Sequence, residues 1–75
     1  MLTEDDVRQI VREAVINVDV SKLGRDTSFF DAGLDSLDHA SVLLALQEKH
    51  GLLVPDEDVE SLTTIQSILE YARRK

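Results

Sequence analysis

Apolar residues recur along three stretches of the chain at the spacing of an amphipathic helix. The first stretch follows Thr3 and places apolar side chains at i, i+3, i+4, i+7 and i+8, namely Val7, Ile10, Val11, Ala14 and Val15. Thr3 is a suitable N-cap, and three acids follow it, where negative charge is favourable at the positive end of the helix macrodipole. The pattern predicts a helix over residues 3–17.

The second stretch, residues 36–50, has Asp35 at the N-cap position and Gly51 directly after its last residue. Its apolar residues cover two faces. One group can face a core: Val42, Leu43, Leu46 and, beside them, Ala45. The other group lies on a second side of the helix: Leu37, Ala40, Ser41 and Leu44. The three apolar members of this second group form a ridge at i, i+3 and i+7, called here the apolar ridge, which is suited to docking in a partner's groove. Burial of both faces inside a four-helix packing is the alternative.

The last third of the chain predicts two further helices. Pro55 precedes a run of acids, which is typical of a short helix, here residues 56–61, with proline near its first position. Thr63 and Gln66 fit the capping-box pattern. A final amphipathic stripe follows, consisting of Ile65, Ile68, Leu69 and Ala72. We predict a fourth helix there.

Periodicity fails over residues 18–34, which we interpret as a long crossover loop held to the core by Leu23, Phe29 and Phe30. The sequence contains no alternating strand pattern and no linker. We therefore expect an all-α fold, a single domain over residues 1–75 that forms a small four-helix bundle. Three helices are of full length, one is short, and the long loop joins the first two.

Charge narrows the classes of partner. Eight Lys and Arg face 15 Asp and Glu, a net charge of −7, and residues 26–60 alone hold nine acids against one lysine, which gives −8. A nucleic-acid binder needs a positively charged surface, so we do not expect nucleic acid as a partner. We expect partners with basic docking surfaces and a monomeric chain. The chain has no cysteine, no basic leader at its acidic N-terminus, and no apolar run of about 18 residues. We expect a cytoplasmic protein without membrane insertion.

Catalytic and metal-binding patterns are incomplete. Ser36 begins a helix after a glycine-containing loop, yet residues 33–37 lack the second glycine of a G-x-S-x-G elbow, and no strand precedes them. The acidic run 56–60 lacks the turn glycine and the distal glutamate of a calcium loop. His39 and His50 are interpreted as a surface residue and a helix-end residue. We expect neither an enzyme nor a metal site.

Ser36 is instead well placed for modification. A hydroxyl at a helix N-terminus can carry a phosphodiester, because the unpaired N–H groups and the dipole favour the anion. Acids from several segments can form one negative surface around it, namely Asp35, Asp38, Glu48, Asp56, Glu57 and Glu60. The unmodified alternative is a helical docking protein that uses this acidic face alone.

Residues 30–38 (FDAGLDSLD), the helix that ends at Gly51, residues 54–57 (VPDE) and residues 62–65 (LTTI) together resemble an acyl carrier protein over the whole chain. The resemblance implies that Ser36 carries 4′-phosphopantetheine, derived from coenzyme A, whose thiol holds an acyl group as a thioester. It also implies a phosphopantetheinyl transferase, which installs the arm, and acyl-loading and acyl-processing enzymes, which dock on the acidic surface and the apolar ridge. The loop aromatics and the inner helix faces would then line an interior able to shelter part of an acyl chain.

The pathway stays open at this point. Peptidyl carriers typically read Gly-Gly-His/Asp-Ser-Leu at the site, so Leu34-Asp35 favours the acyl type over an aminoacyl or peptidyl carrier. Ser41 and Gln47 occupy outward positions where carriers of fatty-acid synthesis often have carboxylates. A fatty-acid pathway, a polyketide pathway and another specialised acyl pathway are all compatible with the residues.

Overall fold

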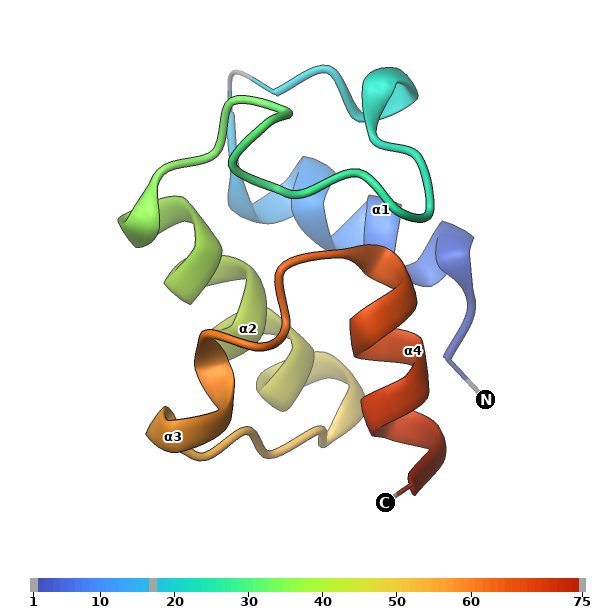
Figure 1. Ribbon diagram of the computed structural model, residues 1–75, viewed down its shortest axis with the longest axis vertical. Coiled ribbons are helices and arrows are strands. Elements are labelled where there is room, and N and C mark those ends of the chain that lie inside the picture. Colours follow the sequence, from blue (N-terminus) through green and yellow to red (C-terminus); the bar gives the residue numbers. More distant parts are fainter. Residues whose placement is uncertain (1, 17, 75) are drawn as a thin grey trace.

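A computed structural model describes residues 2–16 and 18–74, and the chain forms a helical bundle over them (Figure 1). The α-helices are α1 (Glu4–Ala14), α2 (Ser36–His50), α3 (Asp56–Val59) and α4 (Ile65–Arg74), and a 3-10 helix, η1 (Val20–Lys22), lies in the crossover loop. The described residues contain no strand, which confirms the all-α prediction. Among the residues that the structure describes, no helix is long and apolar enough to cross a membrane.

Helix α1 begins as its sequence predicts and ends earlier. The Thr3 hydroxyl accepts the Asp6 N–H at 3.2 Å, and the Asp6 carboxylate accepts the Thr3 N–H at 3.0 Å, a bond that holds the pKa of Asp6 below its ordinary value. The predicted end at residue 17 is wrong, because Val15 already has extended backbone with φ −126° and ψ 122°. Val15 and Ile16 are both β-branched, and the extended backbone still leaves the Val15 side chain buried.

The core lies where α1, α2 and α4 meet. α1 packs against α2 and, less extensively, against α4. The fully buried apolar side chains come from all three helices and the crossover loop: Val7, Val11, Phe29, Val42, Leu46, Ile65 and Ile68. The predicted inward face of α2 is therefore correct. Its second face is exposed, with Leu37 79% and Leu44 55% accessible, so burial of both faces is wrong.

The crossover loop is joined to the segment between α3 and α4, residues 60–64, which we call the α3–α4 link. The Phe29 N–H donates to the Thr63 carbonyl oxygen at 2.8 Å, and the Gln66 N–H at the start of α4 donates to the Arg25 carbonyl oxygen at 2.9 Å. Phe29 is fully buried as predicted. The prediction that Phe30 also fills the core is wrong, because Phe30 is 45% exposed.

Helix ends in the second half of the chain differ from prediction in detail. Gly51 takes the left-handed conformation, φ 68°, and ends α2 as expected. α3 ends at Val59, two residues early, and Pro55 is its N-cap rather than its first helical residue. The capping box predicted for Thr63 and Gln66 is wrong, because the Gln66 N–H is bonded to the crossover loop. Thr64 and Ser67 form the reciprocal pair, with N–H to hydroxyl distances of 3.0 and 3.1 Å.

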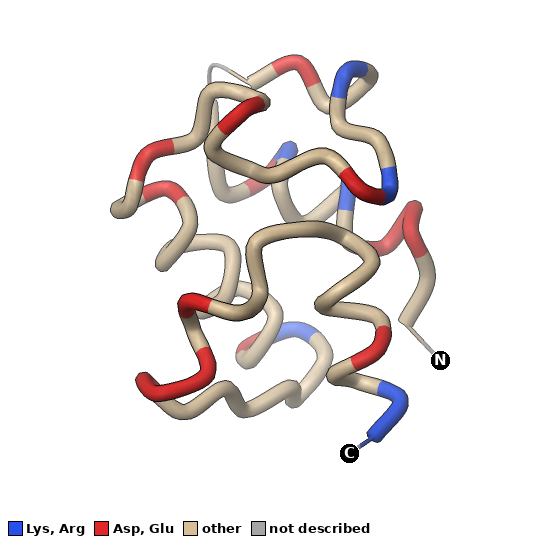
Figure 2. Tube along the Cα trace, viewed as in Figure 1, with Lys and Arg blue, Asp and Glu red and all other residues tan. Residues whose placement is uncertain are grey.

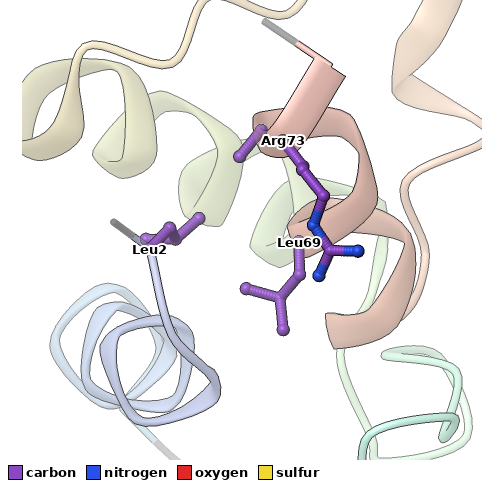
Figure 3. Close-up of a pocket in the computed structure, with 4 residues that line it drawn as sticks. Leu2, Leu69 and Arg73 are labelled. Atoms are coloured by element: carbon purple, nitrogen blue, oxygen red, sulfur yellow. The ribbon is translucent and has the colours of Figure 1, made fainter.

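Two contacts bring distant parts of the chain together outside the core. Glu13 of α1 forms an ion pair with Lys49 of α2, and this bond holds the pKa of the Glu13 carboxyl below its ordinary value. Near the chain ends, Leu2 faces Leu69 and Arg73 of α4 across a pocket of about 270 Å³ (Figure 3). The ion pair thus links α1 to α2, and α1 also packs directly against α4.

Two leucines of α2 test this assignment of faces. Leu46→Ala should lower the free energy of unfolding by about 2–5 kcal/mol, because Leu46 is fully buried and its loss leaves a cavity. Leu44→Ala, on the exposed face, should change it by no more than about 0.5 kcal/mol. Urea unfolding followed by circular dichroism measures both. Equal losses in the two variants would show that the helix is turned differently.

Candidate functional site

Ser36 is the first residue of α2, and its side chain is exposed. A tight turn immediately before it fixes its position. The Phe29 carbonyl oxygen accepts N–H bonds from Ala32 at 3.1 Å and Leu34 at 3.0 Å, while the Leu34 side chain is buried. Gly33 completes the turn with φ 104°, a conformation that side chains of L residues rarely adopt. Since Phe29 is itself anchored in the core, the turn places the serine hydroxyl at the surface.

The N-terminus of α2 carries a capping box made of two acids. The Asp35 carboxylate accepts the Asp38 N–H at 2.8 Å, and the Asp38 carboxylate accepts the Asp35 N–H at 3.2 Å. The His39 N–H donates to the Asp35 carbonyl oxygen at 2.9 Å. Within the described part of the chain, the N–H groups of Ser36 and Leu37 are left without a protein acceptor. These two donors and the helix dipole favour an anion attached at Ser36.

Beside Ser36 lies an open groove of about 390 Å³, which we call the serine groove. Its lining comes from the crossover loop, the start of α2, the end of α3 and the α3–α4 link: Phe30, Ser36, His39, Val59, Glu60 and Thr63. Sequence reasoning selected Ser36 and Glu60 but not the other four. They lie far apart along the chain and meet only because the loop and the link are joined.

His39 is the buried residue of this site, with 4% of its surface exposed. Its Nε2 lies 2.6 Å from the Leu62 carbonyl oxygen and must carry the hydrogen, since a carbonyl oxygen only accepts. Its ring also contacts two phenylalanines, with centroid distances of 5.9 Å to Phe29 and 5.3 Å, edge-on, to Phe30. Nε2 of His39 is thus occupied by a hydrogen bond that joins α2 to the α3–α4 link.

The prediction that His39 lies on the surface is wrong, whereas His50 is exposed at the helix end as expected. A signal for burial was present in the sequence. His39 stands at i relative to Val42, Leu43 and Leu46 at i+3, i+4 and i+7, and thus completes the inward stripe.

One of the predicted acidic residues, Glu48, lies away from Ser36 at the far end of α2. Figure 2 shows acids along α3, at the start of α2 and in the crossover loop, and the crossover loop also carries basic residues. Glu60 shares the serine groove with Ser36, and Asp56 and Glu57 are exposed on α3. Glu48 lies twelve residues along α2, a distance of about 18 Å, well beyond the screening length of about 8 Å.

The apolar ridge is confirmed as an exposed surface, because Ala40 and Ser41 are accessible along with the two leucines. Ile16, 93% exposed, was not among the predicted site residues. It shares a depression of about 240 Å³ with Asp38 and therefore lies next to the first turn of α2. The sequence held one signal for this exposure: Ile16 directly follows Val15, the last residue of the apolar stripe, and is not part of it.

In residues 2–16 and 18–74, no group of three His, Asp or Glu side chains is placed so that it could hold a metal ion. What the site offers is one hydroxyl, presented by a rigid turn at a helix N-terminus beside an open groove. Fold and site together define a small helical bundle that exposes the Ser36 hydroxyl at the first position of α2.

Comparison with known protein families agrees with this arrangement. Residues 5–72 match the family model for a phosphopantetheine attachment site, and the chain belongs to that family. Its members covalently bind 4′-phosphopantetheine, so the chain is a phosphopantetheine carrier of the acyl carrier protein type, a class that is typically non-catalytic. Carriers of this family are modified by phosphopantetheinyl transferases and interact with acyl-processing enzymes.

Asp35 can stabilise α2 through its cap hydrogen bond to the Asp38 N–H or through its negative charge. Two substitutions separate these contributions. Asp35→Ala should lower the free energy of unfolding by about 1 kcal/mol, because the Asp38 N–H loses its acceptor. Asp35→Asn keeps an oxygen at the same place and should lose less than half of that. Urea unfolding of both variants at neutral pH is the measurement, and equal losses would mean that charge rather than capping is responsible.

Proposed function

We propose that Ser36 is the attachment residue and that the chain presents acyl groups, held as thioesters, to the enzymes of a fatty-acid, polyketide or other specialised acyl pathway. The observation that supports this best is the exposed hydroxyl at the first position of α2, next to two free N–H donors. Ser36 lies inside the matched range, residues 5–72.

The residues around Ser36 fit a phosphate ester. The Ser36 oxygen would form the new bond to phosphorus as coenzyme A loses adenosine bisphosphate, and the hydroxyl proton would pass to a base of the transferase. The Ser36 and Leu37 N–H groups would then stabilise the phosphodiester anion. When bound, the arm supplies the thiol that forms the thioester. The chain itself supplies the position, the local dipole and the docking surface.

Docking would combine two surfaces that flank Ser36. Glu60, Asp56 and Glu57 provide negative charge on the α3 side, and the apolar ridge provides contact area along α2. Charge complementarity of this kind speeds encounter with a basic partner and leaves binding weak enough for release, as a shuttle requires. Ile16 extends the apolar contact beyond the residues that the sequence singled out.

Mass spectrometry tests the attachment site. Incubation with coenzyme A and a promiscuous phosphopantetheinyl transferase should add the mass of one arm to the wild-type chain and none to Ser36→Ala. Ser61→Ala, which removes another exposed hydroxyl, should still gain one arm. A gain in Ser36→Ala would place the arm elsewhere. No gain in the wild type with several transferases, together with unchanged partner binding by Ser36→Ala, would favour the unmodified docking protein.

Two matched charge reversals test the electrostatic part. Glu60→Lys should lower the second-order rate of modification by about tenfold at low salt, because Glu60 lies in the serine groove. Glu48→Lys makes the same change of charge at the far end of α2 and should lower it by less than about twofold. Stopped-flow or timed-quench kinetics at two salt concentrations measures both. Equal effects would show that net charge, not the local field, guides the transferase.

A further inference from the structure

We infer that His39 closes the helical bundle beneath the attachment serine, so that acyl cargo lies in the open serine groove and not in the core. This inference rests on the proposed attachment at Ser36. It predicts a class of cargo: acyl groups with a short alkyl part, which do not need shelter from water.

The lining of the groove separates it from the core. Seventeen buried apolar residues form the core, and none of them lines the groove in the described part of the chain. Three lining residues are exposed (Phe30, Ser36 and Glu60), and two are half-buried (Val59 and Thr63). Among the lining residues His39 is buried, and Val59 is half-buried and packs against the core cluster. His39 therefore forms the buried part of the boundary between the groove and the core.

Hydrogen bonding and ring packing fix His39 in that place. The bond from Nε2 to the Leu62 carbonyl oxygen, 2.6 Å long, joins α2 to the α3–α4 link. Phe29 and Phe30 pack their rings against the imidazole, and the Phe29 N–H is itself bonded to Thr63 of the same link. A chain that passed from Ser36 into the core between α2 and the link would have to displace the ring. The Leu62 carbonyl group would then lose its donor.

This barrier changes which cargo the carrier favours. Each methylene transferred from water to an apolar interior shifts an equilibrium by about fourfold. A long alkyl chain kept in the groove gains only part of this, because the groove is open to water. Short acyl groups lose little by staying outside. The selection would come from His39 and the rings that hold it, not from a contact with the cargo's carbonyl.

Chemical protection of the thioester provides the test. The wild-type chain, His39→Ala, His39→Gln and His50→Ala are loaded with acetyl or octanoyl arms from the corresponding coenzyme A thioesters by a promiscuous transferase. Intact mass confirms one arm on each. The rate of cleavage by hydroxylamine is then compared between the octanoyl and acetyl forms of each variant.

In the wild type the two rates should agree within about twofold, since neither chain enters the core. In His39→Ala the octanoyl form should be cleaved at least about fivefold more slowly than the acetyl form, because the path to the core is open. His39→Gln retains an N–H donor for Leu62 and should behave as the wild type. His50→Ala, the exposed histidine of the same helix, should also match the wild type.

Protection of the octanoyl form in the wild type would overturn the inference, as would equal rates in a folded His39→Ala. Methyl NMR shifts of Leu46 and Ile68 in the wild type give a readout that does not depend on any variant folding. They should be the same in the acetyl and octanoyl forms, and a shift would overturn the inference. Failure to load any arm on the wild type would overturn the proposed attachment itself, and this inference with it.

Discussion

The backbone bonds between the crossover loop and the far end of the chain are the constraint on which the rest of the site depends. The loop has little regular structure, so it must satisfy its buried N–H and C=O groups elsewhere. Phe29 does so at Thr63, and Arg25 does so at Gln66. These bonds hold the turn before Ser36 against the segment that leads into α4. The serine groove exists because the two segments meet, and its lining is drawn from both sides of the contact.

The acids near Ser36 fall into two groups that differ in their hydrogen bonding. The carboxylates of Asp35 and Asp38 each accept a hydrogen bond from the other residue's backbone N–H. These bonds cap the start of α2 at Ser36. Glu60, Asp56 and Glu57 are exposed and able to meet a basic partner. A carboxylate at a helix start is thus not simply a recognition residue, even beside the proposed attachment serine. Charge counts along a sequence do not distinguish the two groups, whereas hydrogen bonds do.

Features governed by local sequence could be predicted, and features governed by contacts across the fold could not. The three full-length helices, the cap at Thr3, the glycine stop at Gly51 and the two faces of α2 follow from periodicity and terminal residues. Thr64 rather than Thr63 caps α4 because the neighbouring N–H of Gln66 is claimed by Arg25. The same reason applies to the serine groove, whose walls come together only in three dimensions.

Individual side chains show the same division. Ser36 could be predicted as a site residue, because the N-cap residue Asp35 and the glycine-containing loop before it mark the start of a helix in the sequence. His39 and Phe30 were misplaced because each was judged by residue type: an imidazole was assigned to water and a phenyl ring to the core. In the fold they pack against each other, since the carbonyl group of Leu62 offers the imidazole a partner in the interior. A buried polar group is governed by its partner, and the partner lies 23 positions away.

The turn at Gly33 has a consequence for the chemistry of the chain itself. A methyl group built on this residue would meet nothing within 4 Å, so the space around it is open. The obstacle to an L-alanine here is the positive φ of 104°. What the turn before the serine requires at Gly33 is therefore a handedness of the backbone and not the absence of a methyl group. Glycine meets this requirement because, being achiral, it adopts positive φ about as readily as negative φ.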